Sequence, residues 1–125
     1  MAEQHESERT AYLQQMEKDR GYILDFHKIL ADEDFEFLKR YDALMHSAYL
    51  NSETEIDSKT KELILIAVLV AVRSSGEHIR THMLTAKQLG ASKKEILELL
   101  EMCLPPVGLP AFMEGFEIWR EVYEV

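Results

Sequence analysis

The chain has 125 residues, of which 14 are Lys or Arg and 23 are Asp or Glu, so its net charge is −9. This acidic balance argues against nucleic acid and against an anionic membrane as partners. The single cysteine, Cys103, excludes an internal disulfide framework, a four-thiolate zinc site and a Cys-x-x-Cys redox pair. With 46% hydrophobic and 30% charged residues, we expect one globular domain over residues 1–125.

The sequence also predicts where the protein resides. Its start, Met1 to Glu6, is polar and acidic, whereas a signal peptide needs a basic start and an apolar run. The longest apolar run, Leu63 to Val72, has ten residues, but a membrane span needs about 20. A lone thiol suits a reducing compartment. We therefore expect a soluble cytoplasmic protein.

Breakers of regular structure are scarce, which predicts an all-α fold of five to six helices. All three prolines lie between residues 105 and 110, and the chain has only five glycines. Residues 1–20 form a polar N-terminal helix or arm, with a weak helix over 8–20 that ends at Gly21. Apolar residues then recur at helical spacing from Tyr22 to Leu30, and Asp34 can cap the following helix.

The segment from Leu63 to Val72 is apolar at every position and is compatible with a buried strand or a buried helix. We favour a helix capped by Asp57 or Ser58, because the run is long for a strand and nothing else in the chain would pair with it. A helix that is apolar all round indicates burial against another subunit, so we expect a homo-oligomer.

The C-terminal third predicts three more helices. After a break at residues 73–76, a helix runs from Glu77 to Leu89. Ser92 and Glu95 form a capping box that starts the next one. We expect the prolines of residues 105–110 to end that helix in a loop, with Pro110 at the first position of the last helix.

The richest polar cluster is the segment from Glu77 to His82. His78 and His82 are one turn apart and share one helical face, flanked by Glu77 and Arg80. Such a pair can bind a transition metal together with a carboxylate such as Glu77, or act as a general acid and base near neutral pH. It can also be an ordinary solvated face, with His82 as a satisfied structural group beside the core.

Two further residues carry a possible role in chemistry. Glu62 stands near the start of the apolar helix, where a negative charge is favourable. An antiparallel hairpin could also place it within reach of His82, although the spacing alone does not decide this. Cys103 lies on an apolar stripe and is expected to be a small core residue, with a catalytic thiol as the less favoured alternative.

Four segments, taken in order, resemble the carboxymuconolactone decarboxylase family, which includes the alkylhydroperoxidase D-like proteins. The resemblance runs from Lys59 to about Val122, with residues 57–123 as the family-like core. The matching segments are Lys61–Ala67, Glu77–His82, Ala86–Ile96 and Gly108–Ala111, and the block Leu89–Ile96 is the most family-like. The resemblance implies an all-helical subunit assembled as a trimer or hexamer.

The peroxidase branch of that family uses a Glu, two cysteines and a following His as a thiol and proton-relay site. By resemblance Glu62 matches the Glu and His82 the His, while Ser74 or Ser75 and His78 occupy the cysteine positions. A peroxide-reducing dithiol needs a second sulfur to resolve the first, so dithiol peroxidase activity is not expected.

The chain is instead similar to the decarboxylase branch, which also lacks the cysteines. This implies lyase or acid/base chemistry on a small carboxylated or lactone substrate, with Glu62, His82 and His78 as catalytic residues. Arg80 and Glu77 would bind the substrate, and no cofactor and no resident metal are expected. The alternatives are an oligomeric accessory or binding protein that kept the scaffold without the thiols, and a histidine-based metal-binding protein.

Overall fold

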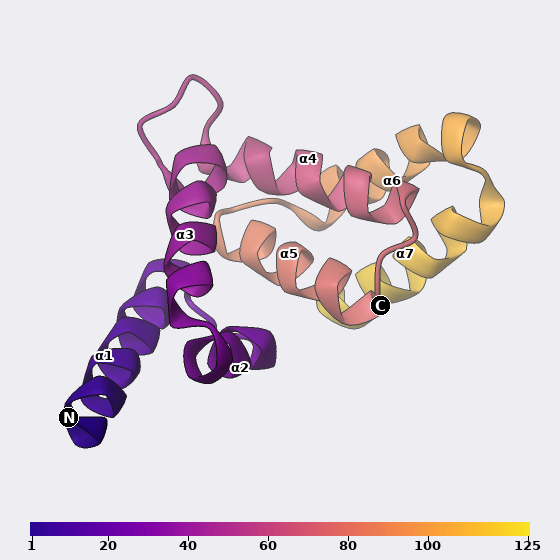
Figure 1. Cartoon of the computed structure of the whole chain (residues 1–125). Coiled ribbons are helices and arrows are strands. Elements are labelled where there is room, and N and C mark those ends of the chain that lie inside the picture. Colours follow the sequence, from indigo (N-terminus) through magenta and orange to yellow (C-terminus); the bar gives the residue numbers. More distant parts are fainter. The chain divides into compact units, whose positions relative to one another are not determined.

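The computed structural model describes residues 1–125 and contains helices but no strand (Figure 1). None of its helices combines the length and the apolar character that crossing a membrane requires. The all-α prediction is confirmed, with one helix more than the five to six expected. In chain order the elements are α1 (Ala2–Arg20), α2 (Asp25–Glu33), α3 (Phe35–Met45), the π-helical segment η1 (His46–Leu50), α4 (Ser58–Ala71), α5 (Gly76–Gln88), α6 (Lys93–Val107) and α7 (Leu109–Tyr123).

The chain forms two compact units, Met1–Ser52 and Glu53–Val125, each of which has its own hydrophobic cluster. The first unit holds α1 to η1 around a small centre of Met16, Ala31 and Leu38, all at most 1% exposed. The residues next to each helix end determine where its helices begin and stop.

The two expected caps of the first unit are both present. Gly21 takes φ 83° at the end of α1, where an L side chain would be strained. The Asp34 carboxylate accepts the Phe37 N–H at the start of α3.

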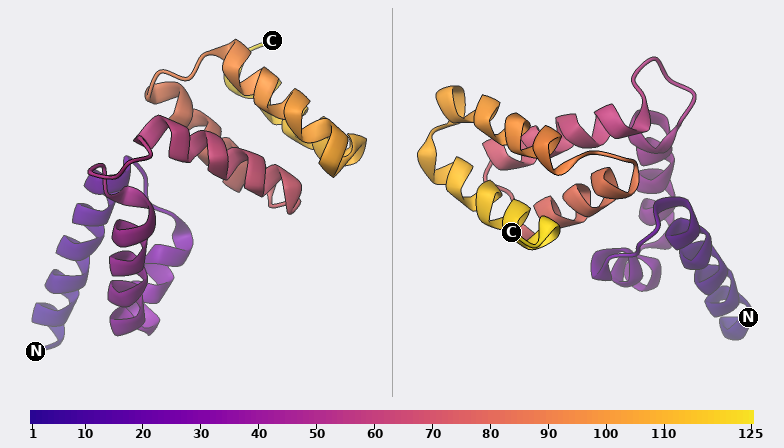
Figure 2. Two further views of the ribbon diagram at one scale, coloured as in Figure 1. Left: turned by 90° about the horizontal axis from the view of Figure 1, so that it is seen from above. Right: turned by 180° about the vertical axis from the view of Figure 1, so that it is seen from behind.

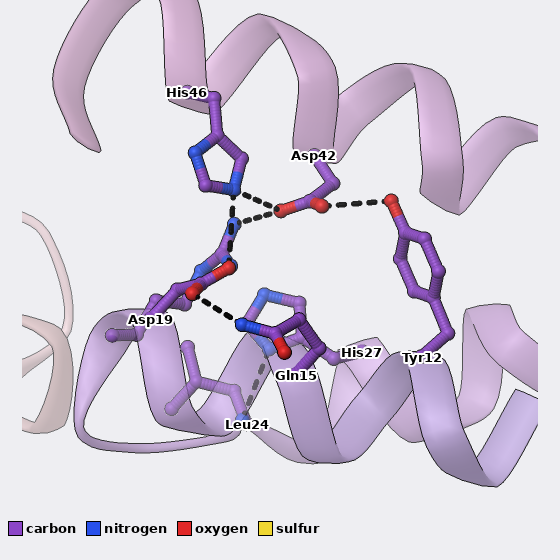
Figure 3. A network of polar contacts seen from close by, with 8 residues as sticks. Tyr12, Gln15, Asp19, Leu24, His27, Asp42 and His46 are labelled. Carbon is purple, nitrogen blue, oxygen red and sulfur yellow. Dashed lines mark hydrogen bonds and ion pairs between the residues drawn. The ribbon is translucent and has the colours of Figure 1, made fainter. Parts of the chain in front are cut away.

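A polar network crosses the first unit beside this small core (Figure 3). Asp42 accepts hydrogen bonds from Tyr12 Oη and Arg20 Nη2, both at 2.7 Å, and His46 Nε2 lies 3.6 Å from the same carboxylate. His27, at 1% exposure, accepts the Leu24 N–H through Nδ1, while its Nε2 has no partner. Burial, together with the nearby Arg20 charge, lowers the pKa of His27 from 6.5 to about 4.

The second unit is a four-helix arrangement of two antiparallel hairpins, α4–α5 and α6–α7 (Figures 1 and 2). Helix α4 contacts α5 and α6, and α7 also contacts α5 and α6. The four helices therefore enclose one core. Residues of all four helices fill it, among them Ile66, Met83, Leu100 and Trp119. The Trp119 indole donates a hydrogen bond to the carbonyl of Lys93, the first residue of α6, at 2.9 Å.

Gly115 of α7 sets the closest approach in this core. A Cβ at this position would lie 2.9 Å from Leu100 Cδ2 on α6 and 3.2 Å from Val70 Cγ2 on α4. The missing side chain therefore allows three helices to meet at one point.

Two boundary predictions are wrong. The N-terminal helix begins at Ala2 and not at residue 8, because a helix without an apolar stripe gives no periodicity from which its start can be read. Helix α6 continues through Pro105 and Pro106 to Val107, so the expected proline loop shrinks to Gly108. Each proline keeps a helical φ but loses its own N–H bond and crowds the carbonyl four residues earlier, so the helix continues only to Val107, where the Gly108 N–H closes the last turn on the Leu104 carbonyl.

Candidate active site

The α4–α5 hairpin carries every residue to which the sequence assigned catalysis. Its two helices begin at side-chain caps: Asp57 accepts the Thr60 N–H at 2.7 Å, and Ser75 accepts the His78 N–H at 3.2 Å. The run from Leu63 to Val72, ambiguous between strand and helix, is helical through Ala71. The sequence therefore fixes both helix starts through local hydrogen bonds.

The turn between the two helices is a Schellman motif with an unusual residue in it. The Arg73 N–H bonds the Val70 carbonyl at 3.2 Å, and the Ser74 N–H bonds the Leu69 carbonyl at 2.9 Å. Arg73 occupies the left-handed region at φ 59°, where glycine is usual. Its guanidinium binds both carboxylate oxygens of Glu114 on α7, at 2.7 and 3.0 Å, and this holds the turn in place.

The hairpin brings Glu62 of α4 against His82 of α5. Glu62 Oε2 lies 2.7 Å from His82 Nδ1, and the two residues are 2% and 6% exposed. An ionised carboxylate only accepts hydrogen bonds, so next to one the imidazole donates from Nδ1 and carries its basic lone pair on Nε2. The pair thus selects one orientation and one tautomer of His82.

His78 lies one turn before His82 on the same face of α5, with the two ring centroids 5.1 Å apart. It is exposed, and its Nδ1 lies 3.2 Å from Ser74 Oγ. Partial burial of the ring, followed by repulsion from His82, lowers the pKa of His78. His78 is therefore a neutral imidazole at neutral pH, able to accept a proton at the surface next to the buried Glu62–His82 pair.

The two residues assigned to substrate binding lie on the same helix but outside this pair. Arg80 donates to Glu121 of α7 at 2.7 and 3.0 Å, so its guanidinium already has a carboxylate. Glu77 is exposed, and its backbone carbonyl accepts the Thr81 hydroxyl at 3.0 Å. Their roles toward a substrate stay predictions.

A sequence model of one family matches most of the chain, over residues 36–121, and its description is the carboxymuconolactone decarboxylase family. The chain belongs to the carboxymuconolactone decarboxylase family. The matched region covers α3 to α7 almost completely, so the whole Glu62–His82 hairpin lies inside it. The polar helix α1 and the short helix α2 lie before the match begins.

The chain is also similar to the uncharacterized protein MJ0742 of Methanocaldococcus jannaschii. The two sequences are 37% identical over 68 residues, which is 54% of this chain and 64% of the relative. The match therefore covers less than two thirds of that relative's length.

Within this family member, the geometry does not support a metal site made by the histidines. No group of three or more His, Cys, Asp or Glu side chains lies close enough together to hold a metal ion. The hypothesis of a site built from His78, His82 and Glu77 thus has no ligand cluster behind it.

Cys103 belongs to α6, outside the hairpin that carries the histidine pair, and lines the groove between α6 and α4. It is 9% exposed, and burial raises the pKa of its thiol. A buried thiol with a raised pKa is a poor nucleophile, so the core interpretation of Cys103 is favoured.

Two grooves mark the surface of the second unit, and neither is lined by Glu62 or His82. One, of about 710 Å³, runs between α5 and α7, with Ser74 and Ile79 among its lining residues. The other, of about 650 Å³, lies between α4 and α6 and is mainly apolar, with Val68 and Met102 among its lining residues.

Sequence reasoning missed the contact of Ser74 with His78. The signal was present, because Ser74 precedes His78 by four residues and a helix N-terminus brings such positions together. The Arg80–Glu121 pair, 41 residues apart, left no such local signal.

Proposed function

We propose that this family member is a small-molecule enzyme of the decarboxylase-like branch, which performs lyase or acid/base chemistry on a small carboxylated or lactone substrate. The observation that carries the proposal is the buried contact of 2.7 Å between Glu62 and His82. Burying two ionisable groups costs free energy, and a pair retained at 2% and 6% exposure needs a reason beyond stability.

In this proposal His82 shuttles a proton and Glu62 orients its ring. The exposed His78, with its ring centroid 5.1 Å from that of His82, exchanges the proton with the substrate. Arg80 leaves Glu121 to bind a substrate carboxylate, a fork-shaped contact that a guanidinium makes well, and Glu77 lines the approach. A neutral His78 beside a fixed His82 suits proton transfer near neutral pH.

The test is a screen of small carboxylated acids and lactones with the full chain, in which product formation is followed by mass spectrometry. We expect His82→Asn to lower turnover at least 100-fold, since a positioned acid or base contributes roughly 10²–10⁴-fold. Glu62→Gln keeps the shape of the side chain and removes the charge, so it should cause a smaller loss.

The matched control is His5→Asn, which changes an exposed histidine near the start of α1. It should retain wild-type turnover. Equal turnover in His82→Asn and the wild type would refute the proton-relay role.

We also propose that the protein is a homo-oligomer, a trimer or hexamer as in its family. One face of α4 leaves large apolar side chains exposed, with Ile64 at 47%, Val68 at 49% and Val72 at 66%. This face continues into the apolar groove with Met102 of α6, 78% exposed.

Light scattering at micromolar concentration should give the mass of a trimer or hexamer, and Val68→Asp should lower it. The control Leu44→Asp changes an exposed apolar residue of α3 and should leave the mass unchanged. A monomeric mass for the wild type would contradict the proposal.

A further inference from the structure

Ser74 is a polar residue of the α4–α5 hairpin that takes no part in the proposed proton relay. Its hydroxyl oxygen lies 3.2 Å from Nδ1 of His78, and the same residue lines the groove of about 710 Å³ between α5 and α7. A hydroxyl within hydrogen-bond reach of a base, at the edge of a cavity, is the arrangement of an activated nucleophile.

The backbone holds this hydroxyl in place. Ser74 occupies the second position after the cap of α4, where a Schellman motif usually has an apolar residue packed on the preceding helix. The neighbouring Arg73 adopts the left-handed region at φ 59°, a strained conformation for a residue with a side chain, and its two bonds to Glu114 hold it there. Ser74 therefore lies in a strained turn directly before α5, and this turn fixes the position of its hydroxyl.

The groove has a composition that selects the acyl group. Its lining combines the apolar side chains of Ile79, Ile118 and Met113 with the charged side chains of Arg73, Glu114 and Glu117. Arg73 pairs with Glu114, and Arg120 pairs with Glu117, so the charges around the groove are balanced and the apolar lining favours a neutral group.

The N-terminus of α5 meets the groove at Gly76, its first residue. A helix leaves the N–H groups of its first turn without intrahelical acceptors, and there the helix dipole favours negative charge.

We propose that Ser74, activated by His78, is an acyl-accepting nucleophile for neutral esters or lactones with a short apolar acyl chain. The inference rests on the proposed function for the role of His82 behind His78, and it adds a covalent step at the same hairpin. The serine is a catalytic residue in this scheme because its oxygen bonds the substrate.

The step balances without any further reagent. Ser74 Oγ forms a bond to the carbonyl carbon as its proton passes to His78 Nδ1, and the carbonyl oxygen takes the negative charge. The bond to the leaving alkoxide oxygen then breaks as His78 returns the proton to it. Water, deprotonated by His78, releases the acid from Ser74 by the same route. The lowered pKa of His78, due to burial and to His82, keeps the imidazole in the form that accepts the proton.

Two measurements on the full chain test the inference. A fluorophosphonate probe should label one residue per chain, Ser74, identified by peptide mass mapping. Hydrolysis of p-nitrophenyl butyrate should fall at least 100-fold in Ser74→Ala. His78→Gln, which keeps the serine and removes the base, should slow labelling at least 100-fold.

The matched control is Ser75→Asn, which removes the adjacent hydroxyl but keeps an N-cap acceptor for α5. It should label and hydrolyse like the wild type, and far-UV circular dichroism should show equal helix content in all four proteins. Absence of label from Ser74 overturns the inference, as does wild-type hydrolysis in Ser74→Ala or wild-type labelling in His78→Gln.

The two proposals fail in distinguishable ways. If Ser74 is not labelled but turnover of the screened substrates depends on His82, only the nucleophilic role of Ser74 is refuted. If Ser74 is labelled but the screen of carboxylated acids and lactones shows no turnover that depends on His82, the proton relay is refuted and the nucleophile stands.

Discussion

Removing one partner of the Glu62–His82 pair should cost far more stability than removing both. His82→Leu takes away the imidazole 2.7 Å from a carboxylate that is only 2% exposed. Loss of one member of a buried pair typically costs about 3–5 kcal/mol, because the remaining group stays desolvated without this partner. Glu62→Gln keeps a neutral hydrogen bond in place of a charge-assisted one and should cost only about 1 kcal/mol.

The single variant Glu62→Met, which removes the carboxylate from His82, should also cost about 3–5 kcal/mol. The double variant Glu62→Met with His82→Leu combines the two substitutions and removes both polar groups at similar volume. It should unfold with a free energy within about 1 kcal/mol of the wild type, so that the coupling energy of the cycle is several kcal/mol. The assay is urea unfolding at neutral pH, followed by far-UV circular dichroism. The exposed Glu98→Gln serves as control and should be neutral. A double variant as unstable as the sum of the two single variants would refute the reasoning.

Three other predictions concern stability and redox chemistry. The pKa of His27 is about 4 in the folded chain against 6.5 in the unfolded chain, so the unfolded chain binds the proton more tightly. About 3 kcal/mol of stability should therefore be lost as the pH falls from 6.5 to 4. Urea midpoints at several pH values should show this loss in the wild type and not in His27→Gln. Gly115→Ala should destabilise the fold by about 1–3 kcal/mol, measured by thermal unfolding, because its Cβ meets Leu100 and Val70; an unchanged midpoint would mean that the helices separate freely. Cys103→Ser should leave hydroperoxide consumption with a thiol reductant at the background rate of the wild type, and a loss of activity would contradict the absence of a thiol mechanism.

Features determined by neighbouring residues could be predicted from the sequence. The capping box of Ser92 and Glu95 forms as expected, with both reciprocal bonds at 2.9 and 3.0 Å. Asp34 and Asp57 cap their helices for the same reason, since each accepts an N–H three residues ahead. These contacts require only that a helix begins there.

Features that depend on tertiary packing could not be predicted in this way. The spacing of Glu62 and His82 allowed a contact, but the antiparallel packing of α4 on α5 decides it. No local pattern in the sequence predicts Glu121 as the partner of Arg80, because the two residues meet only through the packing of α7 on α5. The end of α6 was predicted wrongly because Pro105 and Pro106 shorten the helix without ending it at once, and the helix continues to Val107.

The confinement of the candidate site to one hairpin bears on how the protein folds. The contact between Glu62 and His82 closes a loop of only 20 residues, and the entropy cost of closing a loop rises slowly with its length. Proteins rich in contacts so near in sequence fold faster than those dominated by distant contacts. The layout of the candidate site is therefore encoded within a single helical hairpin, and it requires no contact between residues far apart in the sequence.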